Sequence, residues 1–76
     1  MVSKGGRGSK KLELVKKAII AVAKEKEFSR HQYYKITDTQ IWGKILDLGY
    51  DRYIEEKQVH GLRAKLPKGY SNSYFR

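Results

Sequence analysis

Residues 37–66, TDTQIWGKILDLGYDRYIEEKQVHGLRAKL, carry most of the signals that decide the fold of this 76-residue chain. Thr37 and Gln40 have the spacing of a capping box, in which each side chain satisfies a backbone N–H at the start of a helix. Apolar residues then recur up to Gly49, and glycine readily takes the left-handed conformation that ends many helices. The stretch therefore predicts a helix between Thr37 and Gly49.

The rest of this stretch predicts a further helix after a short connection. Asp51 can cap its start, and Pro67 cannot continue it, so we expect the helix to run from Asp51 to about Leu66. Two helices joined so closely cross at a steep angle, which is the geometry of a helix-turn-helix unit.

The faces of this last helix follow from its period of 100° per residue. With Val59, Leu62 and Leu66 facing inward and Ile54 at the start of this inner side, the outward residues are predicted to be Lys57, His60, Gly61 and Ala64, flanked by Arg63 and Lys65. Glycine in a helix interior lowers helix stability by about 1 kcal/mol relative to alanine, so the presence of Gly61 needs an explanation. Either it admits a close nucleic-acid backbone, or it accommodates a neighbouring helix.

The sequence on either side of these helices completes the predicted fold. Ser9 can cap a first helix over about Lys10–Glu27, whose buried stripe comprises Leu12, Val15, Ala18, Ile19, Val22 and Ala23. Trp42 is expected in the core. Aromatic and β-branched residues in 28–36 predict a loop leading into a short strand, and the turn residues after Pro67 predict a wing-like hairpin. The predicted fold is mainly α with a little β: a compact three-helix core.

Composition and charge narrow the classes of function. The chain has 17 Lys and Arg against 8 Asp and Glu, a net charge of +9, which favours a polyanionic partner such as nucleic acid. Without cysteine there is no thiolate zinc site, and His31 and His60 stand far apart, so we expect no metal and no cofactor. The longest apolar run, residues 18–23, is too short to cross a bilayer, so we expect no membrane partner.

Two units are expected along the chain. Residues 1–10 combine glycine, serine and basic residues with little to bury, and they predict a flexible basic arm. Such an arm either lies along phosphates or in a minor groove, with Arg7 the inserting side chain, or is simply a solvated terminus. Residues 11–76 form the single folded domain.

One segment resembles a known superfamily. Residues 59–66, VHGLRAKL, followed by Gly69 and Tyr70, look like the recognition helix and wing of winged-helix effector domains of response regulators. The resemblance covers about a dozen residues and implies an architecture of helices with a wing, in which the last helix reads DNA. It does not extend to the amino-terminal sheet of those effectors, for which this chain has no room.

The sequence thus predicts a DNA-binding protein, a small transcriptional regulator or an architectural factor. Arg63 and Lys57 are candidate donors to guanine, Gln58 a candidate partner of adenine, and Lys65 and Lys68 candidate phosphate ligands. Duplex DNA is favoured over RNA, and a homodimer is a candidate assembly because one helix reads few base pairs. The residues expected to contact nucleic acid are Lys4, Arg7, Lys10, Lys11, Arg30, Arg52, Lys57, Gln58, His60, Gly61, Arg63, Ala64, Lys65, Lys68, Asn72 and Arg76.

Two other functions stay open at this stage. The six tyrosines of the chain would suit an RNA- or ribosome-associated protein, in which they stack on unpaired bases. Alternatively, Tyr50, Tyr53 and Tyr70 would form a patch for a protein partner, as in a module that regulates a nucleic-acid enzyme. We expect no enzymatic activity and no small-molecule substrate, because the sequence has neither a phosphate-cradling glycine loop nor a metal cluster. An intracellular location is expected, in the cytoplasm or nucleoid, or the nucleus of a eukaryote.

Overall fold

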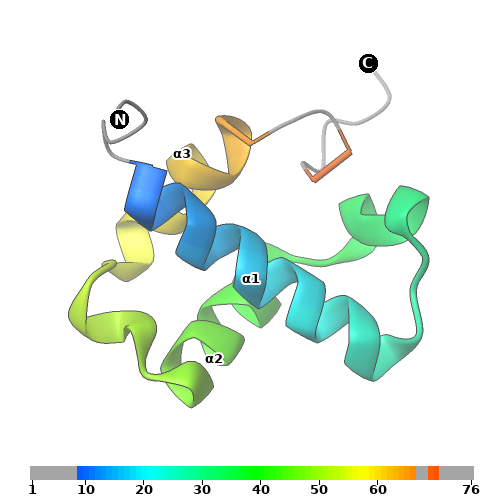
Figure 1. Ribbon diagram of the computed structural model, residues 1–76, viewed down its shortest axis with the longest axis horizontal. Helices are drawn as coiled ribbons and strands as arrows, with labels where there is room; N and C mark the ends of the chain where they lie inside the picture. Colours follow the sequence, from blue (N-terminus) through cyan, green and yellow to red (C-terminus); the bar gives the residue numbers. More distant parts are fainter. Residues whose placement is uncertain (1–8, 67–68, 71–76) are drawn as a thin grey trace, which may run out of the picture.

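The computed structural model describes residues 9–66, 69 and 70, and this part of the chain is helical, with no strand among the described residues. Three α-helices form its frame (Figure 1). Helix α1 (Ser9–Lys26) lies in front in that view, α2 (Asp38–Leu48) lies behind and below it, and α3 (Val59–Ala64) sits beside its N-terminal half. Both α2 and α3 pack against α1 and against each other.

Helix α1 supplies about half of the core. Its buried residues recur at three- and four-residue intervals, as the sequence predicted, and they pack against the buried isoleucines of α2. Leu12 of the predicted stripe is only half-buried, whereas Leu14 is buried. The buried members of α1 are Leu14, Val15, Ala18, Ile19, Val22 and Ala23.

The end of α1 is unusual because a non-glycine residue takes the left-handed conformation there. Glu27 has φ 58°. The next N–H, that of Phe28, donates to the carbonyl of Ala23 at 2.9 Å, which is the long hydrogen bond of a Schellman motif. Glycine is the usual residue at this position, since a Cβ in the left-handed region costs about 1 kcal/mol or more.

Helix α2 begins and ends where the sequence predicted. The Gln40 N–H donates to Oγ1 of Thr37 at 3.1 Å, and the Thr37 N–H donates to Oε1 of Gln40 at 2.9 Å, so the capping box is formed. Gly49 follows with φ 80°. Ile41 and Ile45 are fully buried, and Trp42 packs against the core while staying partly exposed. An ion pair of Lys44 with Glu25 joins α2 to α1.

Two expectations about secondary structure are wrong. Residues Arg30–Lys35 form a 3₁₀ helix, η2, instead of a strand, and Gln32 accepts the Ser29 N–H at 2.8 Å. The predicted helix from Asp51 to Leu66 is broken into η3 (Tyr50–Arg52), η4 (Glu56–Gln58) and α3. Ile54 lies between η3 and η4 and is 1% exposed. Its burial holds the chain in the core at a point where a continuous helix would pass over the surface.

The expected wing falls largely outside the described residues, as do Lys4, Arg7, Lys68, Asn72 and Arg76 and most of the basic arm. Tyr70, which is described, is only 5% exposed and packs at 5.3 Å from the ring of Tyr33. Its burial overturns the proposed patch of Tyr50, Tyr53 and Tyr70, because Tyr70 offers almost no surface to a partner. Tyr53 is 49% exposed and Tyr50 is half-buried.

Candidate nucleic-acid interface

The outward side of η4 and α3 is the first candidate interface. Lys57, His60, Gly61, Ala64 and Lys65 are all exposed, as the helical period predicted. A Cβ added to Gly61 would meet no atom within 4 Å. Gly61 therefore does not accommodate a neighbouring helix within the described part of the chain. Between the longer side chains, this helix presents nearly bare backbone.

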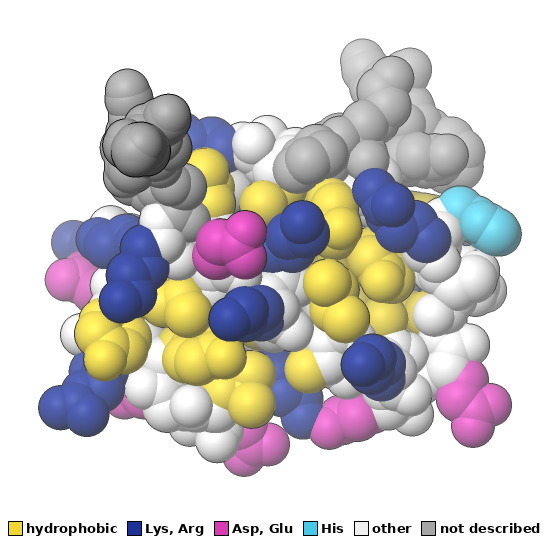
Figure 2. Space-filling model, viewed as in Figure 1, with side chains coloured by type: hydrophobic (Ala, Val, Ile, Leu, Met, Phe, Trp, Pro, Cys, Tyr) yellow, Lys and Arg dark blue, Asp and Glu magenta, His cyan; other side chains and the backbone are white. Residues whose placement is uncertain are grey.

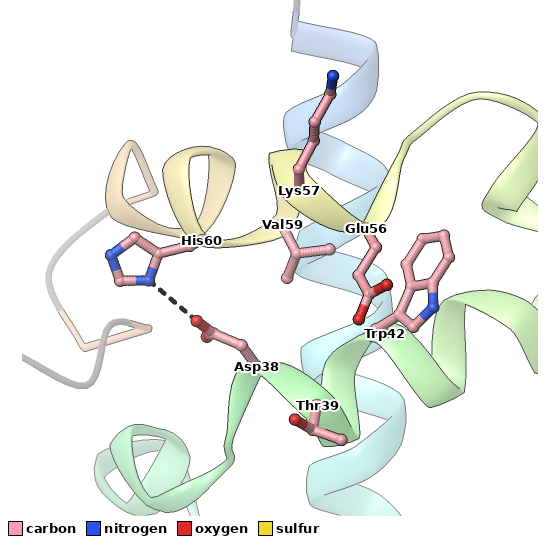
Figure 3. Close-up of a pocket in the computed structure, with 7 residues that line it drawn as sticks. All are labelled: Asp38, Thr39, Trp42, Glu56, Lys57, Val59 and His60. Carbon is pink, nitrogen blue, oxygen red and sulfur yellow. Dashed lines mark hydrogen bonds and ion pairs between the residues drawn. The ribbon is translucent and has the colours of Figure 1, made fainter.

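A shallow groove of about 190 Å³ runs between α2 and this surface (Figure 3). Its floor is partly apolar, made by Val59 and the indole of Trp42, and acidic and basic groups stand around its rim. In Figure 3 the Lys57 side chain extends away from α2. The lining residues are Asp38, Thr39, Trp42, Glu56, Lys57, Val59 and His60.

Asp38 contacts both an exposed residue at the groove, His60, and a buried one, Arg63. Its Oδ2 lies 2.9 Å from Nδ1 of His60, and its Oδ1 accepts a hydrogen bond from a terminal nitrogen of Arg63 at 2.9 Å. Burial raises the pKa of Asp38, but the hydrogen bonds and positive charges of His60 and Arg63 together outweigh burial, so the net pKa lies below its ordinary value. The carboxylate is thus held in its charged form by two partners.

Arg63 is not an exposed reader of bases, and that prediction is wrong. Its side chain is 2% exposed. Besides the bond to Asp38, its Nε donates to the Tyr70 carbonyl at 2.6 Å, and its other terminal nitrogen donates to the Tyr33 carbonyl at 3.1 Å. A sequence signal existed: Arg63 lies four residues after Val59, and this spacing places both on the inner side of a helix.

Gln58 is also largely committed to the fold. It is half-buried, and its Oε1 accepts the N–H of Glu55 at 3.0 Å in the capping box of η4. Bidentate pairing with adenine needs both the donor and the acceptor of the glutamine amide. The structure therefore does not support the expected adenine contact.

The other predicted residues within the described chain lie on different elements. Lys10 and Lys11 are exposed on the first turns of α1, Arg30 is exposed on η2, and Arg52 is exposed on η3. Lys10 is 5.3 Å from the ring centroid of Tyr53. Arg30 lies 5.0 Å from the Tyr70 ring centroid, and Lys16 of α1, which the sequence did not single out, lies 5.9 Å from the same centroid. No spacing rule links residues 16, 30 and 70, so no sequence signal pointed to these contacts.

The exposed lysines and His60 give this surface groups that are able to contact an anion. No group of three or more His, Asp or Glu side chains among the described residues is arranged to hold a metal ion. No helix in the described chain is long and apolar enough to cross a membrane. No protein-family model, curated protein or solved structure matches the chain. Charge and geometry alone therefore guide the assignment of function.

Proposed function

We propose that the protein binds duplex DNA through the outward side of η4 and α3, with this helix in the major groove. The observation that carries the proposal is the exposed α3 surface, on which Gly61 and Ala64 leave the backbone open between Lys57 and Lys65. A flat helix surface can approach base edges closely, while lysines on either side reach phosphates. The net charge of +9 supplies the long-range attraction.

The arrangement of the helices supports a helix-turn-helix mode of binding. In such units one helix lies across the phosphate backbone, and the recognition helix projects from the body of the protein into the groove. Here α3 packs its inner side on α1 and α2, so its outer side is left for a partner. The proposed mechanism is binding alone, with no chemical step, and duplex DNA is the proposed partner in preference to RNA.

Lys57 is available for this role despite its ion pair with Glu55. The two charged groups are 3.5 Å apart, and their side chains are 83% and 68% exposed. An exposed pair of this kind contributes about 0–1 kcal/mol, so exchanging Glu55 for a phosphate costs little. His60 stays near the groove with Asp38 and can add a contact to phosphate or a base edge.

The test is fluorescence anisotropy with a labelled random-sequence duplex between 50 and 200 mM salt. The variant Lys57→Gln/Lys65→Gln should lose affinity on the order of fiftyfold at 0.1 M salt, and its salt slope should be about two units shallower. The matched control is Lys24→Gln/Lys26→Gln, which removes the same charge from the last turn of α1, at the opposite end of α1 from α3 in Figure 1.

The outcomes separate the competing functions. Loss of affinity in the α3 variant but not in the control supports the proposal. An equal loss in both variants would mean that only net charge matters and would reject α3 as the interface. Stronger binding of single-stranded RNA than of duplex DNA of the same length would favour the RNA-binding alternative.

A further inference from the structure

The contact between His60 and Asp38 connects the outward side of α3 to α2. Nδ1 of His60 lies 2.9 Å from Oδ2 of Asp38, the first residue of α2, and the His60 side chain is 81% exposed. The other carboxylate oxygen, Oδ1, accepts the hydrogen bond from Arg63 at 2.9 Å. Each oxygen of Asp38 therefore has its own partner, one exposed and one buried.

The charge of Asp38 decides where the hydrogen in the contact with His60 lies. Burial raises the pKa of Asp38, but its contacts with His60 and Arg63 outweigh burial and keep the net pKa below the ordinary value. The carboxylate is therefore ionised near neutral pH, and an ionised carboxylate only accepts hydrogen bonds. The hydrogen must then lie on Nδ1 of His60. Asp38 acts as a positioning residue that fixes this tautomer.

The second ring nitrogen of His60, Nε2, is the atom that faces a ligand. In Figure 3 it lies on the edge of the ring away from Asp38. With the hydrogen on Nδ1, Nε2 of the neutral ring has a lone pair and only accepts hydrogen bonds. A phosphate group on DNA also offers only acceptors, so the neutral ring has no hydrogen bond to give it. The protonated ring carries a hydrogen on Nε2 as well, and it forms a charge-assisted hydrogen bond with a phosphate oxygen.

Protonation of His60 adds a positive charge that its neighbours do not cancel. Arg63 already balances the charge of Asp38, so these two side chains and a neutral His60 together carry no net charge. The other charged groups at the groove are Glu56 and Lys57 of η4, which are opposite in sign. Helix α1 also packs on α3, but none of its charged side chains forms an ion pair with His60 in the described part of the chain.

We propose that His60 is a proton-dependent phosphate ligand, which contacts the DNA backbone only when its ring is protonated. The contact rests on the proposed binding of duplex DNA by α3, whereas the tautomer of His60 depends on Asp38 and exists without DNA. Histidine is the side chain whose charge ordinarily changes between about pH 5 and 8. Duplex affinity therefore increases as the pH falls through this range, and duplex binding in turn favours the protonated ring.

The pH dependence of duplex binding tests the contact. Anisotropy of a labelled random-sequence duplex is measured between about pH 8 and about pH 5.5, where histidine changes charge and most carboxylates stay ionised. Lysines and arginines, which Figure 2 shows spread over the face on which α1 lies, keep their charge throughout. The variant is His60→Gln. The matched control is His31→Gln, which removes the other histidine of the chain from an exposed position on η2.

The wild type and His31→Gln should bind the duplex on the order of fivefold to tenfold more tightly at the acidic end of this range than at the basic end. Their salt slope should be about one unit steeper at the acidic end, because one more phosphate contact is made. His60→Gln should bind equally at both ends, with the affinity that the wild type has at the basic end. Circular dichroism of each variant confirms that the fold is retained.

The role of Asp38 is tested without DNA. Nitrogen-15 NMR of the imidazole ring at the basic end of the range should show the hydrogen on Nδ1 of His60 in the wild type, and this measurement needs no substitution. In Asp38→Asn, whose amide donates as well as accepts, the hydrogen should be distributed over Nδ1 and Nε2. The rise in duplex affinity should also occur at lower pH in this variant, because the carboxylate that favours the protonated ring is gone.

Three results would overturn the proposal. A hydrogen on Nε2 of the neutral His60 ring in the wild type would refute the tautomer, whatever the result with DNA. A wild-type affinity that is the same at both ends of the pH range, or an increase that His60→Gln keeps, would reject the phosphate contact and leave binding by α3 intact. Absence of duplex binding by the wild type at either end would reject the proposed function and this contact with it.

Discussion

Replacement of Arg63 by methionine separates a structural role from a DNA-reading role. Methionine keeps much of the arginine volume but removes donors that the structure gives to the Tyr33 and Tyr70 carbonyls and to Asp38. Because the site is 2% exposed, water cannot replace these hydrogen bonds without reorganisation of the core. Asp38 itself is 35% exposed and keeps its contact with His60, so water replaces part of the interaction that it loses. The Tyr33 and Tyr70 carbonyls each lose a hydrogen-bond donor, which costs about 1–3 kcal/mol for a buried group, so we expect a total loss of about 3 kcal/mol.

This loss is large compared with the stability of so small a domain. At about 0.05–0.15 kcal/mol per residue, a chain of this length has a free energy of unfolding of roughly 4–11 kcal/mol. With an m-value near 1 kcal/mol/M for a small protein in urea, the midpoint should fall by about 3 M. Unfolding followed by far-UV circular dichroism measures the shift. Lys65→Met is the control, since an exposed substitution should change stability by less than about 0.5 kcal/mol.

A double-mutant cycle tests the pairing itself. Asp38→Asn should be less harmful in the Arg63→Met background than in the wild type, because the carboxylate has already lost its buried partner there. The opposite pattern would refute the reasoning. If Arg63→Met leaves the urea midpoint within 0.5 M of wild type, on the order of the scatter expected for surface changes, while DNA affinity falls tenfold, then Arg63 reads DNA as the sequence suggested.

Four further substitutions test single residues. Glu27→Gly should raise the free energy of unfolding by about 0.5–1 kcal/mol in urea titrations, because Glu27 has φ 58°, and a loss of stability would contradict this. Gly61→Ala should stabilise the fold by a similar amount, because Gly61 has open space around it, yet it should weaken duplex binding. Gly49→Ala should destabilise the fold, because Gly49 has φ 80°. The pKa of Asp38 is lowered on folding, so its charge stabilises the fold above the ordinary pKa of about 3.9, and this contribution is lost as the pH falls through the lowered value. Asp38→Asn should therefore lose less stability than wild type between pH 5 and strongly acidic conditions in thermal melts, and identical pH profiles would contradict the assignment.

The sequence predicted the parts of the fold that local signals control. Thr37, Gln40 and Gly49 act on their own helix ends, so α2 could be placed without knowledge of the rest of the fold. The stripe of α1 was equally readable, because helical periodicity is a property of a single segment. The break in the predicted third helix was not readable in this way. Ile54 was expected on the inner side and is buried, but a helical period alone does not show that the chain leaves the helix on either side of this residue.

The same difference between local signals and long-range contacts applies to the candidate site. Exposure of Lys57, His60 and Gly61 followed from the helical period, and the structure agrees. The inward position of Arg63 was missed because basic residues are almost never fully buried unless paired, and its partner Asp38 lies 25 positions away in sequence. The contacts of Lys16 and Arg30 with the Tyr70 ring were missed because Tyr70 belongs to the other end of the chain.

The hydrogen bonds of Arg63 have a consequence for the local unfolding of α3. A helix of six residues has no stability of its own, because the first turn costs more than it gains. The guanidinium ties this short helix to η2, to the start of α2 and to Tyr70 at once. We therefore expect the amide hydrogens of residues 62–64 to exchange with solvent only when the whole domain unfolds, at rates that give the global free energy of unfolding and not that of local fraying.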